Sequence, residues 1–192
     1  MAPQDSEPVA DRKVFVTVGT TTFDGLIQAV LVPPIISMLH SQGYTSIRVQ
    51  HGESTEIYQA CLTPELEAEL AKCGMSITAF AYADSDEITE EIKFAELVIS
   101  HAGSGTILEC LRYQKRIVVV PNRSLMENHQ LELANEMSKQ KYVVKGNLKN
   151  IDIAIDRSAT YPYRHFPRTG SKVFAEVLEE ELDKLDKDTM YG

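Results

Sequence analysis

The sequence predicts an α/β fold in which helices cover both faces of a parallel β-sheet. Six short runs rich in apolar and β-branched residues lie between residues 13 and 145, and five segments with helical patterning separate them. Strands that alternate with helices are typical of right-handed β-α-β units, which build parallel sheets. The apolar runs are also continuous, which is the pattern of strands buried on both faces.

The order of the elements follows from these runs and from the residues that interrupt them. Strands are expected at residues 13–18, 46–50, 75–80, 97–100, 116–120 and 141–145. Helices are expected at residues 26–39, 64–72, 84–95, 105–113 and 126–140. Pro33 and Pro34 must break or restart the first helix, because proline has no amide hydrogen and clashes with the preceding turn. Gly74 lies just past the second helix, where glycine commonly ends a helix.

The composition divides the chain into three regions. Residues 1–12 are polar and acidic and are expected to be flexible, whereas residues 13–150 form the α/β domain. Residues 151–192 differ, because residues 160–170 are rich in Pro, Tyr and Arg and are expected to be irregular, and a final helix is expected from residue 171. This helix either packs on its own domain or docks on a partner. The apolar residues that would bind the partner are Phe174, Val177, Leu178 and Leu182.

Charge and cysteine content exclude several classes of protein. The net charge of −9 argues against a nucleic-acid-binding surface, which needs clustered Lys and Arg. The three cysteines, Cys61, Cys73 and Cys110, fit neither a disulfide framework nor a zinc site, and they are expected to be reduced, as in the cytosol. The N-terminus lacks a signal-peptide pattern, and no apolar run approaches the roughly 20 residues of a membrane span.

The segment after the fourth expected strand carries the clearest signal for ligand binding. Two glycines there let the backbone approach a ligand, and the hydroxyls and free amides at the following helix start favour a phosphate or diphosphate. A tight turn with an ordinary hydroxyl cap is the alternative. The segment is neither a Walker loop nor the dinucleotide fingerprint, since Leu108 occupies the third glycine position of the latter. Its residues are His101, Ala102, Gly103, Ser104, Gly105 and Thr106.

Two groups of polar residues lie on the helices that follow. Glu109 comes one turn into the first helix, where a carboxylate can accept hydrogen bonds from both hydroxyls of a ribose. A solvated helix glutamate is the alternative. Asn128, His129 and Gln130 lie near the start of the next helix and suit a sugar with several hydroxyls, or a phosphate. Here the alternative is that Asn128 simply caps the helix.

Two loops at the ends of other strands complete the candidate site, because ligands of open parallel sheets bind outside the carboxyl ends of the strands. The first loop can bind an anion through hydroxyl and amide groups, or form a threonine-rich turn. Its residues are Gly19, Thr20, Thr21 and Thr22. The second, expected beside the glycine segment, can contact a nucleobase through its amides and an aromatic ring, with core packing of Phe80 as the alternative. Its residues are Phe80, Ala81 and Tyr82.

In combination, the segments at residues 15–20, 97–109 and 128–132 closely resemble one family. It is the catalytic subunit of the two-subunit UDP-N-acetylglucosamine (UDP-GlcNAc) transferase of dolichol-linked oligosaccharide synthesis, in the pathway of asparagine-linked glycosylation. That family is similar to the carboxyl-terminal half of the bacterial transferase MurG. The resemblance therefore implies a Rossmann-like half of a GT-B glycosyltransferase, followed by a C-terminal helix.

The resemblance also implies roles for the residues above. The segment from Gly103 to Thr106 would hold the diphosphate of UDP-GlcNAc, Glu109 the ribose, and the loop at residues 80–82 the uracil. Residues 128–130 would contact GlcNAc or the diphosphate. The threonines at positions 20–22 replace a glycine-rich loop of the MurG-like enzymes, and His101 is expected to support the glycine segment structurally.

The implied reaction adds GlcNAc in β1,4 linkage, with inversion, to GlcNAc-diphospho-dolichol. No metal or other cofactor is expected, and the general base is expected on another chain. A membrane-anchored subunit would bind the acceptor and recruit this chain to the cytosolic face of the endoplasmic reticulum. Two alternatives are a non-catalytic nucleotide-binding or adaptor module and a serine hydrolase using Ser104 with His101 or His129. Ala102 breaks the first glycine of the hydrolase pattern Gly-x-Ser-x-Gly.

Overall fold

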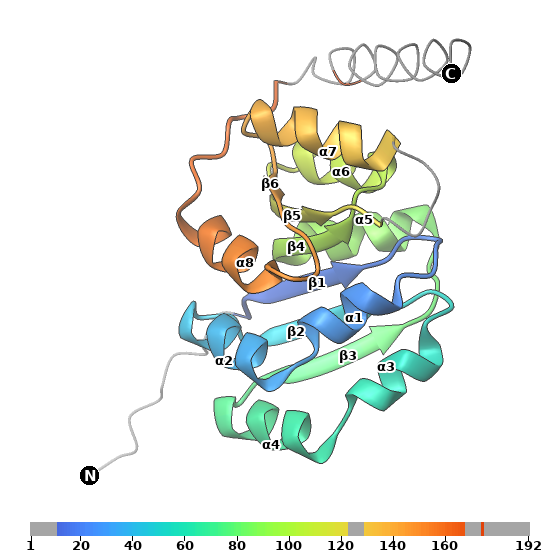
Figure 1. Ribbon diagram of the computed structural model, residues 1–192, viewed down its shortest axis with the longest axis vertical. Helices are drawn as coiled ribbons and strands as arrows, with labels where there is room; N and C mark the ends of the chain where they lie inside the picture. Colours follow the sequence, from blue (N-terminus) through green and yellow to red (C-terminus); the bar gives the residue numbers. More distant parts are fainter. Residues whose placement is uncertain (1–10, 123–128, 168–173, 175–192) are drawn as a thin grey trace, which may run out of the picture.

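The computed structural model describes residues 11–122, 129–167 and 174. Its centre is one six-stranded sheet in the order β3-β2-β1-β4-β5-β6, in which every neighbouring pair is parallel (Figure 1). The strands are β1 (Lys13–Thr17), β2 (Ser46–Gln50), β3 (Ser76–Phe80), β4 (Ala95–His101), β5 (Arg116–Val120) and β6 (Val144–Lys145). The predicted α/β class is therefore confirmed, with all six strands at or near their expected positions.

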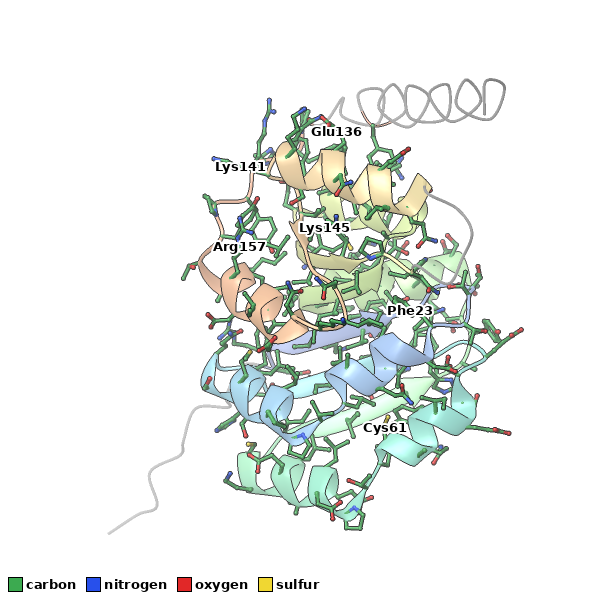
Figure 2. All side chains as sticks on the ribbon, viewed as in Figure 1. Phe23, Cys61, Glu136, Lys141, Lys145 and Arg157 are labelled. Atoms are coloured by element: carbon green, nitrogen blue, oxygen red, sulfur yellow. The ribbon has the colours of Figure 1, made fainter. Side chains whose placement is uncertain are left out.

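Helices pack on both faces of the sheet. They are α1 (Asp24–Val30), α2 (Pro33–Ser41), α3 (Thr55–Cys61), α4 (Pro64–Cys73), α5 (Ser85–Phe94), α6 (Ser104–Arg112), α7 (His129–Lys139) and α8 (Ile151–Thr160). Helices α1 to α4 and α8 contribute buried side chains to one apolar cluster, whereas α5, α6 and α7 contribute to a second. Figure 2 shows side chains filling the layers between the sheet and these helices.

Alternation along the strands explains why the sheet has two cores. Successive side chains of a strand point to opposite faces. In β1, Val14 and Val16 belong to the first cluster, whereas Phe15 belongs to the second. In β5, Val118 belongs to the first cluster and Val119 to the second. These valines of β5 and the three residues named in β1 are all fully buried. A continuous apolar run was therefore the correct indication of a strand covered on both faces.

The expected helix at residues 26–39 is two helices. Val32 is extended, Pro33 and Pro34 begin α2, and the axes of α1 and α2 differ by 61°. Proline suits the first helical positions, since the amides there have no partner within the helix. Among the described helices, no single one is long and apolar enough to cross a membrane, although this bent pair passes by length and composition.

Two of the described helices were not predicted, and one of them begins just after the expected domain boundary. Helix α3 covers only seven residues and buries only Tyr58, so its apolar pattern is short. Helix α8 begins at Ile151, directly after the boundary expected at Asn150. Ile151, Ala154 and Ile155 lie in the first apolar cluster, so α8 is part of the α/β unit rather than of an irregular tail.

The segment after α8 returns across the domain. Gln114 fixes it at Phe166, because the side-chain amide donates to the carbonyl of Phe166 at 2.8 Å and accepts from its amide at 3.1 Å. Phe166 lies edge-on against Tyr142, with ring centroids 5.4 Å apart. Phe174 is also buried in the second cluster, at 4% exposure. Phe174 itself therefore packs on this domain, whereas Val177, Leu178 and Leu182 lie outside the described residues, and the role predicted for this segment stays a prediction.

We expect Phe174→Asp to lower the free energy of unfolding by about 2–4 kcal/mol, because it buries a charge where an aromatic ring packs. Phe94→Asp is the matched control, since Phe94 is 68% exposed and its replacement should change stability by less than about 0.5 kcal/mol. Urea unfolding of both variants measures the difference. Equal stability of the two variants would show that Phe174 does not stabilise this domain.

Candidate functional site

A cavity of about 490 Å³ lies at the carboxyl edge of the sheet, where the loop after β1 meets α5 and α6. Register brings the strand ends together there, because Thr17 of β1 pairs with Gln50 of β2 and with Ser100 of β4. The cavity thus collects residues that are far apart in sequence. Its lining residues are Gly19, Thr20, Gln50, Ala83, Ser85, Ile88, Thr89, Ile92, Gly105, Thr106, Leu108, Glu109 and Arg112.

The N-terminus of α6 opens onto this cavity. Gly103 occupies the capping position and has no side chain with which to bond the first amides of the helix. Gly105 is exposed, and a Cβ atom added to it would meet nothing within 4 Å. Amide groups at a helix start carry partial positive charge and point outward, so an anion can bind them directly. Gly105 leaves room for that approach.

Glu109 faces the same cavity one turn further along α6. Its Oε1 accepts a hydrogen bond from the Thr89 hydroxyl at 3.4 Å, and its Oε2 lies 3.2 Å from Nη1 of Arg112. These contacts come from α5 and from the next turn of α6, so they hold the carboxylate in place. Each carboxylate oxygen has a second lone pair, and the group can therefore still accept two hydroxyl protons from a ligand.

The His101 ring is packed between two glycines. A Cβ atom on Gly19 would lie 2.3 Å from Cε1 of His101, and one on Gly103 would lie 2.3 Å from Nε2. Gly19 also has φ +65°, a conformation that other residues rarely adopt. The imidazole is 6% exposed, and its burial lowers the pKa of His101. A neutral ring thus separates the loop after β1 from the start of α6.

The structure divides the threonine loop between two cavities. Gly19 and Thr20 line the cavity described above, whereas Thr21 and Thr22 line a neighbouring one of about 850 Å³, which Thr20 also borders. The Thr21 hydroxyl donates to the Val18 carbonyl at 2.9 Å, and the Thr22 hydroxyl donates to Glu53 at 3.2 Å. Their hydroxyls are therefore engaged within the protein.

The residues predicted in the loop after β3, at positions 80–82, do not line the cavity, whereas residues that follow them do. Phe80 packs parallel to Phe15, and the guanidinium of Arg48 lies 4.5 Å from the centre of its ring. Tyr82 is 53% exposed and lines a separate hollow beside Arg48. Because β3 is the edge strand, β2 and β1 lie between it and β4, and its end is not beside the glycine segment. Ala83 is the first residue of this loop to line the cavity.

The polar residues at the start of α7 are described only in part. Gln130 lies near the end of β5, since its Oε1 is 3.5 Å from the amide nitrogen of Asn122. His129 is the first described residue of α7. Asn128 and the side chain of His129 lie outside the described part of the chain. The roles predicted for all three stay predictions.

Several lining residues were not singled out from the sequence. Gln50 ends β2, and the rule that ligands bind at carboxyl ends applies to that strand as well. Thr89 lies inside α5, 20 residues before Glu109, so only tertiary packing reveals that it reaches this carboxylate. Arg112 ends α6 three residues after Glu109, a spacing that places the two side chains on one face of a helix. Within the described ranges, no cluster of three or more His, Cys, Asp or Glu side chains is placed to hold a metal ion.

The arrangement gives little support to a serine hydrolase. In the described contacts, the Ser104 hydroxyl has no hydrogen bond to a histidine, and Nδ1 of His101 instead lies 3.5 Å from Ser100. The His101 ring packs against Gly19 and Gly103 instead.

A sequence model of the glycosyltransferase family 28 C-terminal domain matches residues 13–185. The chain belongs to that family. Among similar proteins, a human protein named UDP-N-acetylglucosamine transferase subunit ALG13 is 42% identical over 130 residues, 68% of this chain. Its namesake in Yarrowia lipolytica is 34% identical over 170 residues, which are 86% of this chain and 82% of the relative. By contrast, the chain spans 10% of the length of the human and mouse relatives.

Two solved structures share the fold of this chain. The solution structure of ALG13 matches 88% of this chain and 96% of its own, with a TM-score of 0.69 at 23% identity. Acinetobacter baumannii MurG matches 90% of this chain and 51% of its own, with a TM-score of 0.59 at 14% identity. The family 28 domain thus has the architecture of one half of a GT-B enzyme.

We expect Gly103→Ala to destabilise the protein by about 1–3 kcal/mol, because the added methyl overlaps the His101 ring. In a His101→Ala background the same change should cost at least about 1 kcal/mol less, which a double-mutant cycle by urea unfolding measures. Any preference of a helix start for glycine over alanine cancels in this cycle.

Gly105→Ala is the matched control for that experiment. It lies in the same helix turn with open space around it, so stability should stay unchanged or rise slightly. An equal cost of Gly103→Ala in both backgrounds would mean that the His101 ring does not set the position of Gly103.

Proposed function

We propose that this chain is the UDP-GlcNAc-binding subunit of a heteromeric glycosyltransferase. The observation that carries this proposal is one cavity that combines the uncapped start of α6 with the carboxylate of Glu109. A nucleoside diphosphate needs both features, since its phosphates are anionic and its ribose offers two hydroxyl donors. Membership of family 28 and the names of its relatives support the same donor.

In the proposed complex, the diphosphate binds the amides of Ser104, Gly105 and Thr106. The ribose hydroxyls bind Glu109, and the uracil lies toward Ala83 and Ser85. The GlcNAc extends toward the start of α7, where Gln130 is located. Among the described residues that line the cavity, Arg112 is the one cationic side chain, so helix amides supply most of the attraction for the diphosphate.

The proposed reaction is a single displacement at the anomeric carbon of GlcNAc. The acceptor hydroxyl forms a bond to C1 while the bond from C1 to the UDP oxygen breaks, and a general base takes the hydroxyl proton. Inversion of the α-linked donor produces the β1,4 linkage. The start of α6 stabilises the charge that develops on the departing UDP, and this needs no metal ion or other cofactor.

The acceptor and the base are proposed to come from another subunit. That partner is membrane-anchored, binds GlcNAc-diphospho-dolichol and recruits this chain to the cytosolic face of the endoplasmic reticulum. The relatives' names support a partner, because each is called a subunit. The solved MurG chain, about half of which this chain matches, supports a second half to the enzyme.

We expect the isolated chain to transfer little GlcNAc to a lipid-linked acceptor, and addition of the membrane subunit to restore transfer. The reason is that the acceptor site and base lie on the second subunit. Radiolabelled UDP-GlcNAc with and without membranes that contain the partner measures the effect. Robust transfer by the isolated chain would refute the division of the active site.

We also expect the chain to bind UDP-GlcNAc in preference to ADP-glucose, and Glu109→Gln to weaken that binding roughly tenfold by removing a charged acceptor for the ribose hydroxyls. NMR titration of the labelled chain measures both. Glu67→Gln on the exposed face of α4 is the matched control. The absence of binding to any nucleotide sugar would instead favour a non-catalytic adaptor.

A further inference from the structure

Gln50 is a buried amide that lines the same cavity. It is the last residue of β2, it is 4% exposed, and it lies beside Thr17 at the end of β1. A glutamine side chain is rarely buried unless its polar atoms are bonded, because an unpaired buried amide group is costly. The bonding of its two polar atoms therefore indicates what the cavity accepts.

A chain of hydrogen bonds sets the orientation of this amide. The backbone amide of Gly19 donates to Oγ1 of Thr17 at 3.0 Å, and the Thr17 hydroxyl in turn donates to Oε1 of Gln50. Thr17 is 1% exposed, so water does not compete for its hydroxyl. Since the hydroxyl proton goes to Gln50, the carbonyl oxygen of the amide faces Thr17 and the NH2 group faces away from it.

The NH2 group of Gln50 is left for the cavity. Within the described part of the chain, Nε2 of Gln50 makes no hydrogen bond, whereas its Oε1 does. The surrounding lining includes Gly19 and Thr20 on one loop and Gly105 and Thr106 at the start of α6. The backbone amides at the start of α6 lie at this end of the cavity. Glu109 and Thr89 lie further along α6 and α5.

We infer that Gln50 is a donor-binding residue whose Nε2 donates a hydrogen bond to a phosphate oxygen of the nucleoside diphosphate. This inference rests on the proposed function. It adds a diphosphate contact from β2, whereas the start of α6 follows β4, and these two strands flank β1. An NH2 group can only donate, so its ligand must present an acceptor, and phosphate oxygens carry acceptors alone at neutral pH. The bonds through Thr17 and Gly19 orient Gln50 before the ligand arrives, which reduces the entropy lost on binding.

The test compares Gln50→Leu and Gln50→Glu with the unmodified chain by NMR titration of UDP and of uridine. Gln50→Leu removes the donor, and Gln50→Glu keeps the shape and the acceptor for Thr17 but places an oxygen where the NH2 was. Both should bind UDP roughly tenfold to a hundredfold more weakly and uridine with unchanged affinity. Gln59→Leu on the exposed face of α3 is the matched control and should bind both as the unmodified chain does.

Each other result has a distinct meaning. Unchanged UDP affinity in a folded Gln50→Leu chain, checked by thermal unfolding, would overturn the inference while leaving the proposed function intact. An equal loss for uridine and UDP would assign Gln50 to the nucleoside and overturn the phosphate contact. Failure of the unmodified chain to bind either UDP or UDP-GlcNAc would overturn the proposed function and this inference with it.

Discussion

The contact on which the site depends is the packing of the His101 ring against Gly19 and Gly103. It joins the loop after β1 to the start of α6, and both of these backbone segments line the cavity. The ring is buried and its pKa is lowered, so it acts as a rigid neutral spacer rather than as a charged ligand. A larger residue at either glycine would push the loop and the helix apart. The position of the helix amides therefore depends on an imidazole that need not touch the ligand.

The sheet makes this contact possible. Parallel pairing of β1 with both β2 and β4 aligns Thr17, Gln50 and Ser100 at one edge. Side chains fully buried on both faces of these strands resist sliding, because a shift by one residue would exchange the two apolar clusters. The polar groups at the edge thus occupy defined positions, and the bonds from Gly19 through Thr17 to Gln50 extend that order into the cavity.

Electrostatics within the site rest on dipoles and bonded neutral groups. In the described lining, Arg112 and Glu109 form an ion pair at 3.2 Å, and the rest is uncharged. Such a site attracts a diphosphate through amides that are already oriented. In the proposed function, the same amides would stabilise the charge on the departing UDP.

The sequence by itself determined the class of fold, the strands and the segments worth examining. Continuous apolar runs, proline at helix starts and glycine at turns reflect the conformational preferences of neighbouring residues. These preferences can be inferred from one sequence. The glycine segment and Glu109 were recognisable for the same reason, since both lie within residues 101–109 at one strand-to-helix junction.

Tertiary structure decided what no local pattern contains. It placed β3 at the edge, so that Phe80 and Tyr82 lie away from the cavity and Ala83 lies in it. It brought Thr89 to Glu109, gave Gln50 its orientation through Thr17, and packed α8 onto the sheet. Each of these features depends on contacts between residues far apart in sequence. Such contacts stabilise the protein only after the helices have packed on the sheet.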